Sequence, residues 1–390
     1  MSELELVDKR QRETLISKLQ SILSWLGVLF LVYLLITAVS LISLGFKSTA
    51  GEQAKELFAF ATNPFAALIV GTMATALIQS SSTVTSIIVG LVAGGLPVTV
   101  AVPMIMGSNI GTTITNTLVS LGHIHSKEEF KKAFAAATIH DFFNLLSVII
   151  FLPLEITTHF LEKTALFLSN FFIGGETINL DKFNFIQIIT LPLVNIFEKI
   201  TRIFPKPFDG TGSICIGIVL IFIAIFYIGK LLKLLMVGQA KVILKMAMGR
   251  GPMTGIFAGT LVTILVQSSS TTTSLIVPLA GTDLLTLEQV YPFTLGANIG
   301  SCITALLAAT AVTENQIAAL EIALVHLLYN VTGVIIIYGI PWLRNLPILG
   351  ATTLANISSE RKYLAFIYIV CVFFLIPGLL LGITSINPAF

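Results

Sequence analysis

Two copies of one polar segment interrupt an otherwise apolar chain, Gln79-Ser-Ser-Ser-Thr83 and Gln267-Ser-Ser-Ser-Thr271. Their hydroxyl and amide groups both donate and accept hydrogen bonds. A helix that begins in such a segment also exposes backbone N–H groups with partial positive charge, which attract anions. The oxygen atoms suit a hard cation such as sodium, so each segment can hold an anion and a cation together.

The alternative is that these hydroxyls only join neighbouring helices, as isolated Ser and Thr side chains commonly do in membranes. Three consecutive serines flanked by Gln and Thr, at equivalent positions of two segments, are harder to explain by packing. The pair of segments therefore favours a binding site.

A second repeated motif adds amides and glycines. Gly107-Ser-Asn-Ile-Gly111 corresponds to Gly296-Ala-Asn-Ile-Gly300. The glycines permit close approach of two backbones, which is also ordinary helix packing, while Asn109 and Asn298 offer polar groups. Hydroxyl side chains one helical turn apart follow each motif and share a helix face: Thr112 with Thr115, and Ser301 with Thr304.

Asp141 is the most unusual residue, because it lies in an apolar segment beside His140 and close to Asn144. A carboxylate inside a membrane is costly and by default functional. The alternative is a position near the segment end, within reach of interfacial water. In the matching segment, His326 is followed by Leu327, which predicts ion sites that differ between the two copies. Both histidines are more often hydrogen-bonded core residues than ligands.

None of these motifs contains Arg or Lys. A phosphate-like anion with a charge of about −1.5 to −2 would be costly to transfer there alone. Sodium ions held by the Gln, Ser, Thr, Asn and Asp side chains would supply the missing charge. The pattern therefore predicts obligatory co-transport of an anion with sodium, and no cofactor beyond the transported ions.

The motifs recur in one order along the chain. Gln79 precedes Gln267 by 188 residues, Asn109 precedes Asn298 by 189, and the His140 and His326 segments are 186 apart. This order indicates a duplication, with repeat one at residues 57–153 and repeat two at 249–344. Short transporter repeats are often inverted about an axis in the membrane plane, and we expect that arrangement here.

Apolar stretches elsewhere are long enough to cross a hydrocarbon core of ~30 Å. Residues 1–20 are charged and lack a signal-peptide pattern, so a cytoplasmic segment should precede a first transmembrane helix at 21–46. Six further spans are expected at Val98–Leu121, Phe130–Leu152, Ile214–Met236, Leu287–Val312, Ile317–Leu343 and Tyr363–Ile383.

The two polar segments divide shorter apolar stretches. The halves Asn63–Ile78 and Gly251–Val266 would each cover only ~22 Å as helices, and the chain resumes at Val84 and Thr272. Irregular backbone at membrane depth is tolerated inside protein or beside a water-filled cavity. Each repeat is therefore expected to contain a re-entrant helical hairpin or a discontinuous helix at the break.

The remaining regions connect and end the repeats. Residues 154–248 form a linker with transmembrane segments, in which Thr164–Phe172 and Phe185–Phe197 are either interfacial or parts of spans. Residues 345–390 should hold a C-terminal transmembrane helix. The positive-inside rule assigns a run of basic residues to the cytoplasm: Lys230, Lys233, Lys241, Lys245 and Arg250.

Composition agrees with an all-α polytopic membrane protein. The 390 residues are 55% hydrophobic and only 11% charged, with a mean hydropathy of +0.95, whereas soluble domains carry roughly 25% charged residues. A net charge of +2 argues against a nucleic-acid surface. Three cysteines in apolar stretches, without metal-type spacing, are read as small apolar side chains. The lipid bilayer is the expected environment, and the oligomeric state stays open.

The doubled Gln-Ser-Ser-Ser-Thr, Met106-Gly-Ser-Asn-Ile-Gly-Thr112 and the stretch from Phe130 to Asn144 resemble the type II sodium/phosphate cotransporter family. The resemblance covers both repeats. It implies two inverted repeats, each with a re-entrant hairpin that carries one Gln-Ser-Ser-Ser element. It also implies phosphate ligands from both segments, to which we add two amides: Ser80, Ser81, Ser82, Thr83, Ser268, Ser269, Ser270, Thr271, Asn109 and Asn298.

The resemblance also implies sodium ligands. Asp141 matches an aspartate linked to electrogenic transport, and Asn144 a position linked to further sodium ions. His123, Ser126 and Ala297 stand where vertebrate members have a Gln, an Asp and a Ser, which puts one sodium site in doubt. The expected sodium ligands are Gln79, Gln267, Ser268, Ser301, Thr304, Asp141, Asn144 and Thr112.

The sequence thus predicts a non-enzymatic symporter that couples sodium influx to phosphate uptake by alternating access. The long extracellular loop of vertebrate members is missing, which suggests a compact bacterial relative in the plasma membrane. Alternatives are transport of a dicarboxylate or sulfate, a passive channel, and an intramembrane serine hydrolase. The last is disfavoured because the chain has no Gly-x-Ser-x-Gly elbow.

Overall fold

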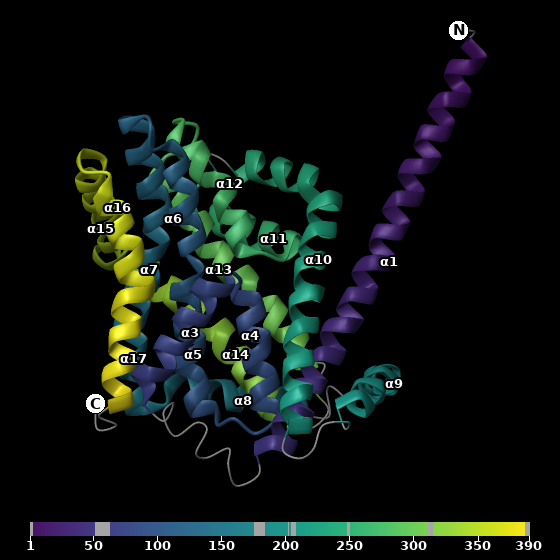
Figure 1. Ribbon diagram of the computed structural model, residues 1–390. Helices are drawn as coiled ribbons and strands as arrows, with labels where there is room; N and C mark the ends of the chain where they lie inside the picture. Colours follow the sequence, from purple (N-terminus) through teal and green to yellow (C-terminus); the bar gives the residue numbers. More distant parts are fainter. Residues whose placement is uncertain are drawn as a thin grey trace.

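The computed structural model describes residues 3–50, 63–174, 184–201, 203, 208–247, 250–310, 312 and 315–386, and all regular elements in these ranges are helical (Figure 1). Within these described ranges, seven helical stretches are long and apolar enough to cross a membrane. Each contains or overlaps one span expected from the sequence, so the chain is an all-α multi-pass membrane protein. The stretches are Leu19–Thr49, Val98–His123, Lys127–Thr158, Phe208–Leu235, Leu287–Thr310, Gln316–Tyr338 and Tyr363–Gly382.

Some helices extend beyond their apolar stretches. Helix α1 (Glu3–Ala50) runs unbroken through the segment expected to precede the first span, and its N-terminal part projects away from the other helices (Figure 1). Helix α7 (Lys127–Thr158) begins before the expected Phe130 because the Ser126 hydroxyl accepts a hydrogen bond from Glu129 N at 3.4 Å. Acidic residues in its first turn also stabilise the helix, because the N-terminal end of a helix carries a partial positive charge.

The two segments predicted to be repeats contain helices in a corresponding order. In repeat one these are α3 (Pro64–Ile78), α4 (Ser81–Ala93), α5 (Val98–Thr112) and α7, with the short α6 (Ile114–Ser120) and a 3₁₀ turn (Leu121–His123) between the last two. In repeat two they are α11 (Pro252–Val266), α12 (Ser269–Gly281), α13 (Leu287–Thr310) and α14 (Gln316–Gly333). The first residues expected of the repeats, 57–62 in repeat one and 249 in repeat two, lie outside the described residues.

Corresponding helices also make corresponding contacts. Helix α3 packs on α5 as α11 packs on α13, whereas α4 packs on α14 of the other repeat and α12 packs on α7. The pair α3 and α4 lies in the lower half of the molecule in Figure 1, and α11 and α12 lie in the upper half. Each repeat therefore places its second short helix against the last helix of the other.

Glycines allow the closest of these approaches. A Cβ atom added to Gly107 would meet the carbonyl oxygen of Leu68, and one added to Gly296 would meet that of Ile256. A side chain could avoid the added Cβ by changing its rotamer, but a helix backbone can avoid it only if the whole helix shifts. The repeated glycines therefore serve helix packing within each repeat, the alternative considered from the sequence.

Replacing Gly107 with alanine is expected to separate α3 from α5 and to lower the free energy of unfolding by about 1–3 kcal/mol or more. The thermal midpoint of the detergent-solubilised protein, read by size-exclusion chromatography, measures this loss. Gly378→Ala is the matched control, because no atom lies within 4 Å of its added Cβ. Equal midpoints for the two variants would contradict the packing role.

The other helices surround the repeats. Figure 1 places α8 (Phe160–Gly174) and α9 (Asn184–Thr201) at the lower end, the two stretches left open by the sequence. The expected C-terminal span is divided into α16 (Tyr363–Val370), a π-helical turn (Cys371–Leu375) and α17 (Ile376–Ile386), and is preceded by α15 (Pro341–Glu360).

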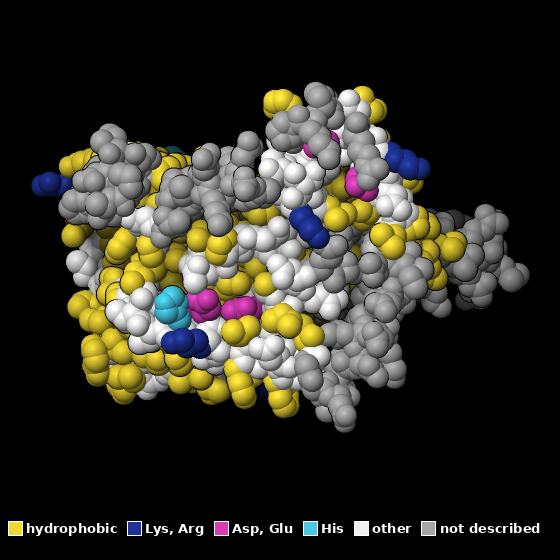
Figure 2. Space-filling model, turned by 90° about the horizontal axis from the view of Figure 1, so that it is seen from below, with side chains coloured by type: hydrophobic (Ala, Val, Ile, Leu, Met, Phe, Trp, Pro, Cys, Tyr) yellow, Lys and Arg dark blue, Asp and Glu magenta, His cyan; other side chains and the backbone are white. Residues whose placement is uncertain are grey.

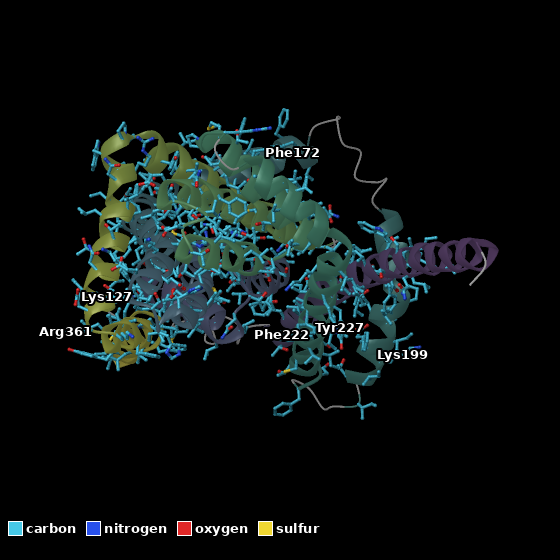
Figure 3. All side chains as sticks on the ribbon, turned by 90° about the horizontal axis from the view of Figure 1, so that it is seen from above. Lys127, Phe172, Lys199, Phe222, Tyr227 and Arg361 are labelled. Atoms are coloured by element: carbon cyan, nitrogen blue, oxygen red, sulfur yellow. The ribbon has the colours of Figure 1, made fainter. Side chains whose placement is uncertain are left out.

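Burial separates central from peripheral spans. Within the Val98–His123 span 83% of the most apolar stretch is buried, against 22% for the spans in α10 (Phe208–Ala247) and at Tyr363–Gly382. Phe222 and Tyr227, labelled in Figure 3, lie on the exposed side of α10. Figure 2, seen from below, shows a small central group of charged side chains and hydrophobic side chains along the margin of the described face. The peripheral helices thus present apolar surface suited to lipid.

Candidate functional site

The two Gln-Ser-Ser-Ser-Thr segments have the same backbone conformation. Helix α3 ends at Gln79 (φ 56°, ψ 28°) and Ser80 is extended (φ −147°, ψ 101°). Helix α11 ends at Gln267 (φ 55°, ψ 28°) and Ser268 is extended (φ −155°, ψ 108°). The left-handed conformation is uncommon for glutamine, and strained conformations of this kind cluster at functional sites.

Only two residues separate the short helices of each pair. The Ser80 hydroxyl accepts a hydrogen bond from Thr83 N at 3.3 Å, and the Ser268 hydroxyl accepts one from Thr271 N at 3.1 Å. These caps start α4 at Ser81 and α12 at Ser269, three residues before the apolar stretches resume at Val84 and Thr272. The remaining serines thus form the first helical turn, where N–H groups have no acceptor within the helix.

The predicted phosphate ligands differ in exposure. Ser80, Ser268 and Thr271 are half-buried. The other hydroxyl-bearing members of the two segments are buried: Ser81, Ser82, Thr83, Ser269 and Ser270.

The glutamines of the two breaks are arranged differently. Thr304 Oγ1 donates to Gln267 Oε1 at 3.0 Å, and Gln267 Nε2 donates to the Ile264 carbonyl at 2.7 Å. The structure thus brings together two of the predicted sodium ligands. Gln79 is exposed, and its side chain has no hydrogen-bond partner within the described part of the chain. The two copies of the segment therefore offer unequal sites in this conformation.

Two predicted sodium ligands bond to their own helices. Ser301 Oγ donates to the Asn298 carbonyl at 2.7 Å, and Thr112 Oγ1 donates to the Ser108 carbonyl at 2.8 Å. Each hydroxyl oxygen keeps lone pairs that can coordinate a cation.

A buried hydrogen-bond network crosses between the repeats. Asn298 Oδ1 lies 2.6 Å from His140 Nε2, and Asn298 Nδ2 donates to Asn144 Oδ1 at 2.9 Å. In the corresponding half, Asn109 Oδ1 lies 3.3 Å from His326 Nε2, and Asn109 Nδ2 donates to Asn330 Oδ1 at 3.0 Å. Each Asn of one repeat thus bonds to the His and Asn of the other.

The two halves of this network are also joined, because Asn144 Nδ2 donates to the Asn109 carbonyl at 2.7 Å. The side-chain amides of Asn109 and Asn298 therefore hold the repeats together in this structure. Their role as phosphate ligands stays a prediction. The motif spacing indicated duplication but gave no sign that the pairing would be crossed.

Asn298→Ala is expected to lower the free energy of unfolding by about 2–4 kcal/mol, because it leaves His140 and Asn144 buried without their partner. Asn356→Ala is the control, because Asn356 is an asparagine exposed on α15. Thermal midpoints of both purified variants test this difference. A stable Asn298→Ala protein with an unchanged midpoint would contradict a structural role of the network.

Asp141 lies outside that network. Its Oδ2 accepts a hydrogen bond from Tyr368 at 2.9 Å, and Thr117 Oγ1 lies 3.5 Å away. The residue is 1% exposed, and Oδ1 has no hydrogen-bond partner among the described residues. The alternative that Asp141 reaches interfacial water does not describe this structure. A buried carboxylate oxygen without a donor is a suitable ligand for a cation.

Sequence reasoning missed two contributors. Tyr368 lies in α16, outside both repeats, so no motif indicated its contact with Asp141. Asn116 Oδ1 accepts hydrogen bonds from Thr273 Oγ1 at 2.9 Å and Ser274 Oγ at 3.1 Å, which joins α6 to the serine-rich helix α12. Its place between Thr115 and Thr117, shortly after the Gly107–Gly111 motif, was a signal that could have identified it.

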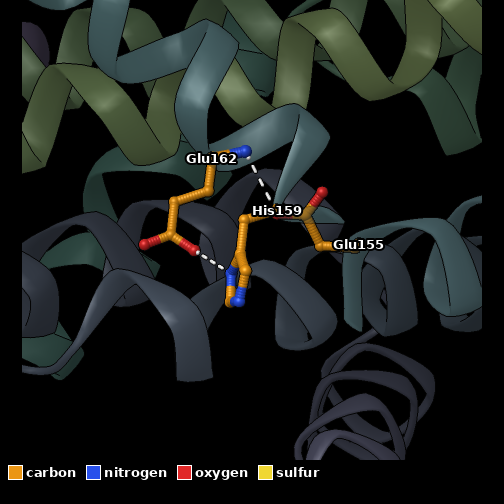
Figure 4. Close-up of side chains that lie close together, drawn as sticks. All are labelled: Glu155, His159 and Glu162. Carbon is orange, nitrogen blue, oxygen red and sulfur yellow. Dashed lines mark hydrogen bonds and ion pairs between the residues drawn. The ribbon is translucent and has the colours of Figure 1, made fainter. Parts of the chain in front are cut away.

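A separate polar cluster lies where α7 meets α8 (Figure 4). Glu155, His159 and Glu162 have potential ligand atoms within 4.8 Å of one another. Glu155 accepts hydrogen bonds from Leu161 N at 2.7 Å and Glu162 N at 3.1 Å. These bonds satisfy the first N–H groups of α8, so the cluster is explained as a helix cap.

Polar breaks inside a multi-pass helical protein, with repeated short helices around a buried polar centre, are features typical of transporters. The family model described as Na+/Pi-cotransporter matches residues 34–230 and 220–341. The chain therefore belongs to the Na+/Pi-cotransporter family. The family resemblance inferred from the motifs is confirmed.

Individual relatives agree with the family model. Sodium-dependent phosphate transport protein 2B of Homo sapiens is 32% identical over 445 residues, covering 90% of this chain and 64% of its own length. Protein 2A of Ovis aries is 33% identical over 463 residues, covering 98% and 72% respectively. The chain thus spans less than two thirds of the human relative. These relatives are transport proteins, not enzymes, and no solved structure matches the chain.

Proposed function

We propose that this protein couples sodium influx to uptake of inorganic phosphate across the plasma membrane, in a bacterial cell. The observation that carries the proposal is the pair of identical breaks, in which Ser80 and Ser268 each cap a helix start made of further serines. A helix N-terminus rich in hydroxyls is suited to a phosphate group. The names of the family and of its relatives support the same substrate and ion.

Phosphate would lie between the two breaks, held by hydroxyls and backbone N–H groups. Sodium ions would supply the counter-charge beside it. The Gln267–Thr304 pair, with Ser268 and Ser301, is the first candidate sodium site. Asp141 and Asn144 are candidates for a second sodium site. Gln79 and Thr112 would bind sodium if the exposed Gln79 side chain turned inward.

Each short-helix pair would act as a re-entrant hairpin, and the two repeats as inverted copies. The opposite positions of α3–α4 and α11–α12 in Figure 1, and the crossed contacts between repeats, support this arrangement. Alternating access would follow from movement of one repeat against the other around the shared site.

The second candidate is the same mechanism with a dicarboxylate or sulfate, because the donors of the site are neutral and general. Uptake of labelled phosphate into proteoliposomes under an inward sodium gradient, with unlabelled competitors in tenfold excess, separates the two. We expect unlabelled phosphate to abolish the labelled uptake and sulfate or succinate to leave most of it. Stronger competition by either of the other anions would refute phosphate as the substrate.

A further inference from the structure

A cavity of about 460 Å³ lies apart from the residues assigned to phosphate and sodium, none of which lines it. It is bounded by the starts of α11 and α13, by the π-helical turn Val334–Tyr338 and by the first turns of α15. The candidate spans Leu287–Thr310 and Gln316–Tyr338 begin and end at this cavity. It therefore lies at the level where the helices leave the hydrocarbon core.

The cavity contains a half-buried cation. Arg344 lines it, and its guanidinium lies 5.4 Å from the centre of the Tyr338 ring. No carboxylate of the described residues lies within ion-pair distance of Arg344, although Glu288 also lines the cavity. A guanidinium presents several donors in a planar fork suited to phosphate. Arg344 also interacts with the Tyr338 side chain, and an anionic group would give its charge the counterion that the described residues do not supply.

A second polar group in the cavity also lacks a partner. Tyr291 lines it and is 1% exposed, and its hydroxyl makes no hydrogen bond. Buried tyrosine hydroxyls usually find a partner. The hydroxyl oxygen itself is buried in this structure, so a ligand oxygen would pair with it after a local shift of the neighbouring side chains, independently of the charge on Arg344.

The walls of the cavity are mostly apolar. Ile276, Phe293 and Ile348 line it, and Trp342, 65% exposed, lies on the adjoining first turn of α15. Exposed tryptophan is typical of the membrane interface. A free anion would gain little from these apolar walls, whereas an amphiphile would contact both the cation and the walls.

We propose that this cavity binds the headgroup of an anionic phospholipid, with the phosphate on Arg344 and the first acyl carbons against the apolar walls. Arg250, which the positive-inside rule assigns to the cytoplasm, directly precedes the cavity residue Gly251. The lipid would thus come from the cytoplasmic leaflet. Basic pockets between membrane helices on that side are suited to anionic headgroups.

The test uses the delipidated full chain in detergent, titrated with dioleoyl phosphatidylglycerol or dioleoyl phosphatidylcholine, with bound lipid counted by native mass spectrometry. We expect phosphatidylglycerol to bind more tightly. Arg344→Gln should weaken its binding about tenfold, as expected for loss of one charge-assisted contact, while Arg344→Lys keeps part of it. Arg361→Gln is the matched control, because Arg361 is exposed at the edge of the molecule (Figure 3).

Equal affinities of wild type and Arg344→Gln for phosphatidylglycerol would overturn the proposal, as would an equal loss in Arg361→Gln. If Arg344→Gln does not fold, Tyr291→Phe serves as the second variant, because it removes only an unpaired hydroxyl. It should weaken phosphatidylglycerol binding severalfold. Unchanged binding in that variant would reject the site. Inorganic phosphate in excess should leave the lipid bound. Displacement by phosphate would assign Arg344 to the free anion and reject the lipid.

Discussion

Phosphate uptake by the Ser268→Ala variant is expected to fall about 10- to 100-fold in kcat/KM. The hydroxyl caps α12, and in the proposed site it contacts both phosphate and sodium. A hydrogen bond to a charged group contributes about 1.5–3 kcal/mol, which corresponds to this range. Loss of the cap alone costs about 1 kcal/mol of stability. Initial uptake rates in proteoliposomes, normalised to folded protein, measure the effect.

Ser268→Thr is the matched control, because threonine keeps a hydroxyl at the same backbone position and is an accepted capping residue. We expect its uptake to stay within about threefold of wild type. The Thr83→Ala variant in the other segment should be impaired like Ser268→Ala. Normal sodium-driven uptake in both alanine variants would remove the two segments from the substrate site.

Replacing Asp141 with asparagine should reduce the charge moved with each phosphate by about one. The side chain keeps its shape, but the buried oxygen without a donor no longer carries charge to hold a cation. Currents on a solid-supported membrane, divided by phosphate flux under the same conditions, give this ratio. An unchanged ratio would exclude Asp141 from the ion sites.

Tyr368→Phe separates the charge of Asp141 from its positioning. This variant removes the hydrogen bond to Asp141 Oδ2 and keeps the carboxylate. We expect a lower apparent sodium affinity with an unchanged charge-to-phosphate ratio. A ratio lowered as in Asp141→Asn would mean that Tyr368 contributes to the ion count and not only to the orientation of the carboxylate.

Local patterns predicted the spans and the breaks well, because both depend on residues close in sequence. Apolar length identified Leu287–Thr310 almost to its ends, and the Gln-Ser-Ser-Ser segments identified the break in each short-helix pair. The exact start of α4 at Ser81 within the polar segment depends on a single hydroxyl, that of Ser80.

Contacts between distant parts of the chain could not be read from spacing. The crossed pairing of Asn109 with His326 and of Asn298 with His140 depends on how the repeats meet. Tyr368 comes from a helix that belongs to neither repeat. The roles of the Gln, Ser and Thr side chains in binding stay predictions.

The most direct test of the central claim is uptake of labelled phosphate into proteoliposomes with and without an inward sodium gradient, the membrane potential being clamped. We predict accumulation with the gradient and none when potassium replaces sodium, because the site has no fixed cation to neutralise phosphate. Equal phosphate entry with and without sodium would contradict coupled transport and indicate a passive pathway.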